Sequence, residues 1–264
     1  MFEAELALAA EVIGRAGDIA TRRFAGDPRP PARDDDAIVR QTSLEIDAMA
    51  RRAIAELIPG DAVNAIPPGE RGDARSWMIH AIDPGDAFLG GIQVWATSIS
   101  MSVGGEAVLG IVAAPALGER YQAVKGSGAW MNGSRIRVSQ TRALAGAFLV
   151  CGSLEAAVRS PSWPALAGVI RDAWDTRGFA GVWAHMLVAR GSADLAIEPG
   201  GLPARVWPAA SLIVTEAGGR LSAFDGAPRA GAGAAVTSNG ALHDQVIERL
   251  RPAPAGARTG SEEG

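Results

Sequence analysis

Apolar positions along the chain repeat with two different spacings, and the spacing changes along the sequence. In residues 2–24 and 43–57 the apolar side chains recur every three or four positions, which is the period of an amphipathic helix. From 77 to 138 the pattern changes to alternating or continuous apolar runs separated by glycine, which is typical of an antiparallel meander. The sequence therefore predicts two helices followed by a sheet, with Ser43 as the N-cap of the second helix.

After residue 146, short apolar strands alternate with helical patterns, which predicts a layered α/β arrangement. The expected strands lie at 147–152, 193–197, 220–223 and 234–237, and the expected helices at 154–169, 181–190, 208–217 and 242–250. We therefore expect an N-terminal α+β half (1–145), a C-terminal α/β half (146–252) and a flexible tail (253–264).

The composition excludes several classes of partner. The formal net charge is -4, so no basic surface for nucleic acid or an anionic membrane is expected. No apolar run approaches the ~18 residues of a membrane span, and acidic residues stand near the N-terminus, where a signal peptide carries positive charge. We expect a cytoplasmic protein with a small-molecule ligand or substrate. Cys151 is the only cysteine and reads as a buried structural thiol.

One stretch concentrates the candidate chemistry. The apolar run 77–82 predicts a buried strand, and it ends in Asp83, Pro84, Gly85 and Asp86, which are turn-forming residues. Carboxylates at the end of a buried strand, followed by glycine, are typical of a metal or phosphate site. We therefore expect the functional centre of the protein at this turn.

Several short sequence motifs elsewhere resemble those of the inositol monophosphatase family of Mg-dependent phosphatases, and together they extend over nearly the whole chain. They lie at 110–112, 115–119, 123–129, 132–139, 212–219, 225–226 and 238–239. The resemblance implies an alternating αβαβα sandwich of the layered α/β class with its site between the two halves. It also implies Mg2+ ions held by carboxylates, and a homodimer, which is common in the family.

The central motif of that family, Asp-Pro-Ile-Asp-Gly-Thr, can be placed in two registers. An ungapped match puts His80 and Asp83 at the two aspartates and Pro84-Gly85 at Gly-Thr, and it keeps later agreements such as Phe88. A slide of three residues instead supplies Asp83 and Asp86 as the aspartates. We prefer the ungapped match, in which Pro84 also removes a backbone N–H from the phosphate loop.

The other ligand motifs of the family are altered in this sequence. When residues are counted from the matching motifs, Ser43 falls at the first aspartate of the family pattern, with Asp47 one turn later. Residues 65–67 fall at the family's Gly-Glu-Glu motif. The late Trp-Asp falls at Arg205-Val206, and Glu198 lies one residue from a substrate-contacting glutamate. Most of the expected metal ligands are therefore substituted.

Three interpretations follow from these substitutions. The preferred one is an enzyme that has lost metal-dependent phosphate hydrolysis, uses no cofactor, and performs acid–base chemistry on a small molecule. The second is a non-catalytic ligand-binding or partner protein. The third is a working Mg-dependent phosphatase of sugar, inositol or nucleotide monophosphates, with Asp83, Asp86 and Glu70 as replacement ligands. The predicted catalytic residues are His80, Asp83 and Asp86, and the predicted substrate-binding residues are Gly85, Glu198, Trp207 and Ser43, with Trp183 as a further apolar wall.

Overall fold

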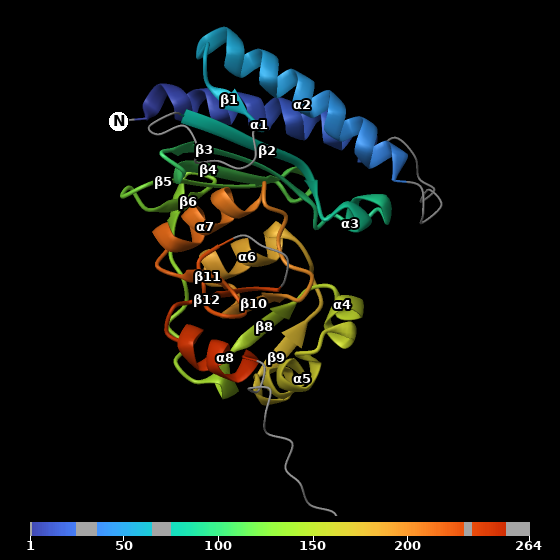
Figure 1. Ribbon diagram of the computed structural model, residues 1–264, viewed down its shortest axis with the longest axis vertical. Helices are drawn as coiled ribbons and strands as arrows, with labels where there is room; N and C mark the ends of the chain where they lie inside the picture. The colour runs from blue at the N-terminus through green and yellow to red at the C-terminus, as the bar shows by residue number, and fades with distance from the viewer. Residues whose placement is uncertain (1, 25–35, 65–74, 230–233, 252–264) are drawn as a thin grey trace, which may run out of the picture.

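The computed structural model describes residues 2–24, 36–64, 75–229 and 234–251, which stack in alternating layers of helices and strands (Figure 1). The outermost layer consists of α1 (Glu3–Phe24) and α2 (Ala37–Leu57), which pack side by side on the first sheet. The second helix begins at Ala37, so the prediction of Ser43 as its N-cap is wrong. The buried Thr42 is already part of the helix, and its hydroxyl donates to the carbonyl of Ile38 at 2.6 Å.

The first sheet contains seven strands in sequence order, antiparallel except for the β1–β2 pair. Its strands are β1 (Ala62–Val63), β2 (Arg75–Asp83), β3 (Ala96–Val103), β4 (Glu106–Ala114), β5 (Glu119–Val124), β6 (Ala129–Met131) and β7 (Ser134–Ile136). The predicted meander is thus confirmed, with β6 as a short strand that the sequence pattern did not show. The helix α3 (Gly85–Leu89) follows β2 directly, and the 3-10 turn η1 (Pro115–Leu117) joins β4 to β5.

The middle layer consists of α6 (Val182–Ala189) and α7 (Trp207–Glu216), which lie between the two sheets (Figure 1). Every residue of α6 is buried, as expected for a helix that is apolar on all sides. Close packing of α7 on the first sheet depends on Gly110, where an added Cβ would lie 3.0 Å from the Cα of Ala209.

The second sheet has the strand order β11-β12-β10-β8-β9, in which β8 runs parallel to both β10 and β9. Its strands are β8 (Phe148–Cys151), β9 (Asp175–Arg177), β10 (Leu195–Glu198), β11 (Arg220–Ala223) and β12 (Ala235–Ser238). The last layer contains α4 (Leu154–Arg159), α5 (Trp163–Asp172) and α8 (His243–Leu250), and the 3-10 turn η2 (Leu144–Gly146) precedes β8. The strand β9 was not predicted, since its polar sequence Asp-Thr-Arg lacks an apolar pattern.

Buried apolar residues form three clusters, one around each layer of helices where it packs on a sheet. This arrangement confirms the predicted αβαβα sandwich of the layered α/β class. The end of β2 and the end of β10 both reach the start of α6, so residues from distant parts of the sequence meet there. Among the described residues, no helix combines the length and the apolar character needed to cross a membrane.

Candidate functional site

The predicted turn lies where β2 ends and α3 begins. The chain passes through a cis peptide bond between Asp83 and Pro84, and Gly85 starts the short helix. Asp86 is exposed in the first turn of that helix, where its carboxylate accepts a hydrogen bond from the N–H of Ala87 at 2.8 Å. Asp83, in contrast, is almost completely buried, with 6% of its surface exposed. The two aspartates therefore have different surroundings although they are three residues apart.

A bulge in β2 brings His80 and Asp83 to the same place. His80 pairs with Ser98 and Asp83 with Ala96 on β3, so three steps along β2 correspond to two along its partner. In a regular strand, residues three apart would point to opposite faces, whereas one extra residue reverses that relation. As a result, Nε2 of His80 lies 4.0 Å from Oδ1 of Asp83.

Two carboxylates meet at the N-terminus of α6. The Oδ2 atom of Asp83 accepts a hydrogen bond from the N–H of Val182 at 2.5 Å. The Oε2 atom of Glu198 accepts one from the N–H of Gly181, at 3.1 Å. The first N–H groups of a helix have no partner within the helix and favour negative charge, which explains why both acids are accommodated here. We call Asp83, Glu198 and these two N–H groups the carboxylate cluster.

The carboxylate cluster fits because two neighbouring residues are glycines and have no side chain. A Cβ added at Gly181, where φ is +79°, would lie 2.7 Å from Oδ2 of Asp83 and 2.5 Å from Cδ of Pro84. A Cβ added at Gly152 would lie 2.1 Å from Oε2 of Glu198. Since such distances are far below van der Waals contact, larger residues at either position would displace the carboxylates.

Burial sets the protonation of these groups. It raises the pKa of Glu198 to about 7, and the nearby Asp83 adds to that rise. Burial also raises the pKa of Asp83, against the opposing effects of His80 and of the Val182 N–H. For His80 burial lowers the pKa, which Asp83 partly offsets. The group thus combines an imidazole with two carboxyl groups that titrate above their usual range.

The remaining predicted residues lie at different distances from this centre. Ser43 and Asp47 are half-buried and one turn apart on α2, and Asp47 forms an ion pair with Arg205 at 3.4 Å. Trp207 is buried in the apolar cluster around α7. Trp183 lies in the same cluster and donates from its indole N–H to Glu119 at 2.7 Å. The indole N–H of Trp183 is thus already bonded.

A cavity of about 420 Å3 adjoins the carboxylate cluster. It lies between the turn after β2 and the segments that precede α4 and α6, and Asp86 is the only charged residue among the described residues that line it. The other lining residues are mostly apolar or small: Pro84, Ala87, Ile92, Val94, Cys151, Ser153, Leu154, Gly178, Phe179 and Ala180. This volume and character suit a small organic molecule.

The described residues do not fit the Mg2+ centre that the family resemblance implies. Within the described part of the chain, no group of three or more His, Cys, Asp or Glu side chains is placed to hold a metal ion. Mg2+ prefers several oxygen ligands in near-octahedral geometry, and His80 with Asp83 supplies a single carboxylate. Glu70, predicted as a replacement ligand, lies outside the described residues. Cys151 is buried, and burial raises its thiol pKa to about 11, as expected for a structural cysteine.

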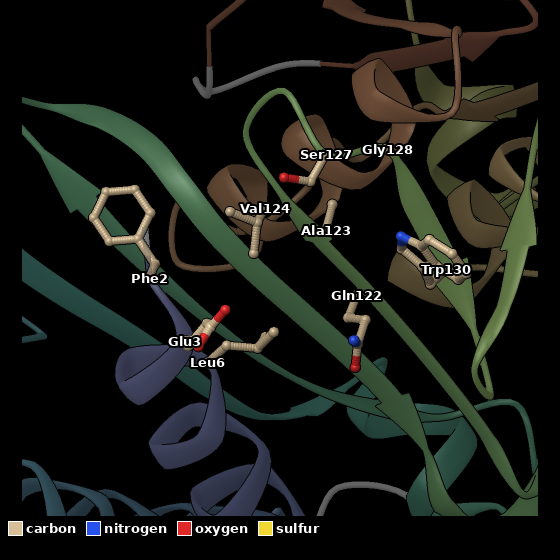
Figure 2. A pocket seen from close by; sticks show the side chains of 9 residues that line it. All are labelled: Phe2, Glu3, Leu6, Gln122, Ala123, Val124, Ser127, Gly128 and Trp130. Atoms are coloured by element: carbon tan, nitrogen blue, oxygen red, sulfur yellow. The ribbon is translucent and has the colours of Figure 1, made fainter.

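Two further cavities share none of these site residues. Figure 2 shows one of about 230 Å3, in which Phe2, Glu3 and Leu6 at the start of α1 lie beside Gln122 and neighbouring residues of β5. The other, of about 400 Å3, lies at the end of α7 and is lined by residues that include Arg135 and Arg137. Neither contains a cluster of titratable groups comparable to that around Asp83.

The layers and the acidic site between them define a five-layer α/β protein whose centre is built from both of its sheets. The chain belongs to the inositol monophosphatase family, since the sequence model of that family matches residues 3–255. The histidinol-phosphatase of Streptomyces coelicolor is 34% identical over 255 residues, which cover 91% of this chain and 95% of that protein. The histidinol-phosphatase of Mycobacterium tuberculosis is 33% identical over 256 residues, covering 93% and 97%.

Solved structures show the same fold. An inositol monophosphatase from Zymomonas mobilis superposes with a TM-score of 0.83 at 24% sequence identity, covering 94% of this chain and 98% of that one. The inositol monophosphatase of Thermotoga maritima gives a TM-score of 0.75 at 25% identity, covering 95% and 97%. The family resemblance read from the sequence is therefore confirmed.

These comparisons contradict two predictions. Loss of metal-dependent phosphate hydrolysis is the wrong interpretation, because relatives that match over 84–97% of their own length are named as phosphatases. The same names do not support a pseudo-phosphatase with a degenerate site. The prediction that no cofactor is used conflicts with membership in a family that depends on Mg2+.

Proposed function

We propose that this protein is a phosphomonoesterase that acts on a small phosphorylated organic molecule, with histidinol phosphate as the first substrate to test. The observation that carries the proposal is the near full-length similarity to two proteins named histidinol-phosphatase. The third interpretation of the sequence, a phosphatase of small monophosphates, is thus the one retained. Mg2+ dependence is expected because it is a property of the family. The roles given below to individual residues involve only their own side chains.

The cavity beside Asp86 supports an organic part of the substrate that is small, largely apolar and positively charged. Its lining is mostly apolar, and Asp86 adds an exposed carboxylate at its edge. Histidinol carries an amino group and an imidazole ring, so it combines positive charge with a flat, partly apolar body. Inositol and sugar phosphates are neutral and rich in hydroxyl groups outside the phosphate, which suits this lining less well.

In the proposed reaction His80, Asp83 and Glu198 take part in proton transfer. His80 is held in its neutral form by burial, and a neutral imidazole accepts a proton from an attacking water. Asp83 lies 4.0 Å away and stabilises the imidazolium that results. Because the pKa of Glu198 is about 7, a substantial fraction keeps its proton near neutrality and can donate it to the leaving oxygen.

The test is release of inorganic phosphate by the purified protein from a panel of monoesters. We expect release from histidinol phosphate in the presence of Mg2+, and loss of release when EDTA removes the metal. Inositol, sugar and nucleotide monophosphates serve as comparison substrates. Absence of release from every ester, at Mg2+ concentrations up to the millimolar range, would show that the proposal is wrong.

Asp86→Asn tests the substrate class separately. The amide keeps the size of the side chain and removes its charge, so we expect KM to rise about tenfold for histidinol phosphate, equivalent to roughly 1.4 kcal/mol. KM for inositol phosphate should change less than twofold, since that ester has no positive charge for Asp86 to attract. Equal effects on both substrates would contradict the role given to Asp86.

We also propose that the protein is a cytoplasmic homodimer that does not bind nucleic acid. The acidic net charge supports the absence of nucleic-acid binding, and the common dimerisation of the family supports the oligomeric state. Sedimentation velocity would give the mass of the particle in solution. A single species of the monomer mass at micromolar concentration would contradict the dimer.

A further inference from the structure

An ion pair between Arg205 and Asp47 joins α2 to the segment before α7, within electrostatic range of His80. Asp47 belongs to α2, in the outermost layer, whereas Arg205 lies two residues before α7, in the middle layer. Their Nη1 and Oδ2 atoms are 3.4 Å apart, and the side chains are 37% and 24% exposed. Solvent, and therefore a small ligand, can reach both partners.

The acidic charge around the site means that a phosphate needs a positive group beside it. Asp83, Glu198, Asp86 and Asp47 are all acidic, while a phosphate monoester carries up to two negative charges near neutral pH. Bringing such an anion among carboxylates is unfavourable unless a positive group accompanies it. Arg205 is close enough to His80 for its charge to lower the pKa of the imidazole, and Asp47 acts in the opposite direction. The guanidinium of Arg205 therefore lies within the electrostatic reach of the site.

Among the described residues, the contact between Arg205 and Asp47 is looser than the other partly buried ion pairs of arginine with a carboxylate. Arg190 approaches Glu119 to 2.6 Å, and Arg75 approaches Glu5 and Asp61 to 3.0 and 3.1 Å. Charge-assisted hydrogen bonds are usually about 2.7–2.9 Å long, so the 3.4 Å contact of Arg205 is weakly formed. A phosphate, which matches the fork of a guanidinium with two oxygens, can compete for it.

An unpaired hydroxyl lies nearby on the sheet. Ser98 is 1% exposed, and within the described structure its Oγ has no hydrogen-bond partner. It stands directly opposite His80 in the β2–β3 register, and such cross-strand pairs share one face of a sheet. Buried hydroxyls are normally satisfied, so the Ser98 hydroxyl is an unmet hydrogen-bonding group on the same face of the sheet as the imidazole.

We infer that Arg205 binds the phosphate group of the substrate, and that Asp47 is the resting partner from which the phosphate displaces it. The inference rests on the proposed function, because that function supplies the phosphate. It goes further by naming a binding residue at the position where the family motif has tryptophan. Arg205 is a binding and positioning residue, and Asp47 sets how readily it is released.

Calorimetric binding of inorganic phosphate, with and without Mg2+, tests the inference without turnover. We expect Arg205→Ala to weaken binding about tenfold or more, as for loss of a charge-assisted hydrogen bond. Arg205→Lys should fall between Arg205→Ala and the unchanged protein, because lysine keeps the charge but loses the fork. Asp47→Asn should tighten binding about threefold, since it removes the competitor for the guanidinium. Arg75→Ala is the matched control, because Arg75 is 36% exposed and begins β2, at the end opposite Asp83.

The opposite signs separate binding from a structural role. If Arg205 and Asp47 only held the halves together, both substitutions would weaken phosphate binding or leave it unchanged, and that result would overturn the inference. So would phosphate binding by Arg205→Ala equal to that of the unchanged protein, or no binding by the unchanged protein. If the protein releases phosphate from an ester but its binding of phosphate does not depend on Arg205, the inference is wrong and the proposed function still holds. Arg205-dependent binding without release from any ester would refute that function and support the inference.

Discussion

Glu119 and Glu198 both connect other parts of the chain to α6, but their surroundings are opposite. The carboxylate of Glu119 accepts hydrogen bonds from Trp183 and Arg190, at 2.7 and 2.6 Å, and from Tyr121 at 2.8 Å. Burial would raise the pKa of Glu119, but these bonds outweigh it and hold the pKa below its usual range. Glu198 faces backbone N–H groups and another acid, and its pKa is about 7.

The comparison shows that one helix is secured in two different ways. At Glu119 an acid and a base are paired, so ionisation stabilises the folded protein. At Glu198 two acids share the N-terminus of α6, so ionisation of both opposes folding. Sites that keep such unfavourable charge arrangements are characteristic of functional centres, where stability is given up for reactivity. We therefore assign a structural role to the first carboxylate and a chemical role to the second.

The largest expected effect follows from removing the structural carboxylate. Glu119→Ala leaves the partly buried Arg190 without its carboxylate partner and should lower the free energy of unfolding by about 3 kcal/mol. Urea denaturation followed by circular dichroism measures this change. Glu106→Ala is the control, since Glu106 forms an exposed pair with Lys125 and should cost less than about 1 kcal/mol. Equal losses in both variants would remove the basis for the comparison.

Asp83→Asn should separate stability from activity. The amide oxygen can still accept the hydrogen bond from Val182, while the buried charge next to Glu198 disappears. We expect phosphate release to fall about 100-fold, equivalent to about 2.7 kcal/mol in the transition state. The free energy of unfolding at pH 8 should stay equal or rise. Activity within threefold of the unchanged protein would contradict a role for Asp83 in the reaction.

Glu198→Gln should give the smallest effect on stability, visible as a change in the pH dependence of the free energy of unfolding. The folded-state pKa of about 7 lies above the ordinary value of 4.5, so the folded protein binds this proton more tightly than the unfolded chain. The resulting stability is complete below pH 4.5 and is lost as pH rises through 7. Between pH 6 and pH 8 the unchanged protein should lose about 1 kcal/mol from this group. Glu198→Gln should lack that loss, and an identical pH profile for both proteins would show that the pKa is not raised.

Much of the fold could be predicted because its signals are local. Apolar periodicity located α1, the meander and most strands of the second sheet to within a few residues. The start of α2 was misplaced because Ser43, in the polar run before the main apolar stripe, looks like a cap, although the helix begins at Ala37. The strand β9 was missed because it pairs only with β8 at the edge of its sheet, where tertiary context replaces sequence pattern.

The sequence predicted where along the chain the site lies, but not which distant residues meet there. The position of Asp83 at the end of a buried strand is visible in the pattern, and its pairing with His80 was proposed from their proximity. The bulge that brings both to one face depends on the register with β3, which the pattern does not specify. The contributions of Gly181 and Arg205 come from segments more than 90 residues away, and neither stands in a position where the family motif has a ligand.

The hydrogen bond between Asp83 and Val182 joins residues 99 positions apart and has a consequence for how this protein can be divided. A fragment of residues 1–145 contains His80 and Asp83, whereas Glu198, Arg205 and the start of α6 all belong to the remainder. Neither piece holds a complete site, although each contains a sheet of its own. Chimeras with relatives, split reporters and truncations must therefore keep both segments as a matched pair.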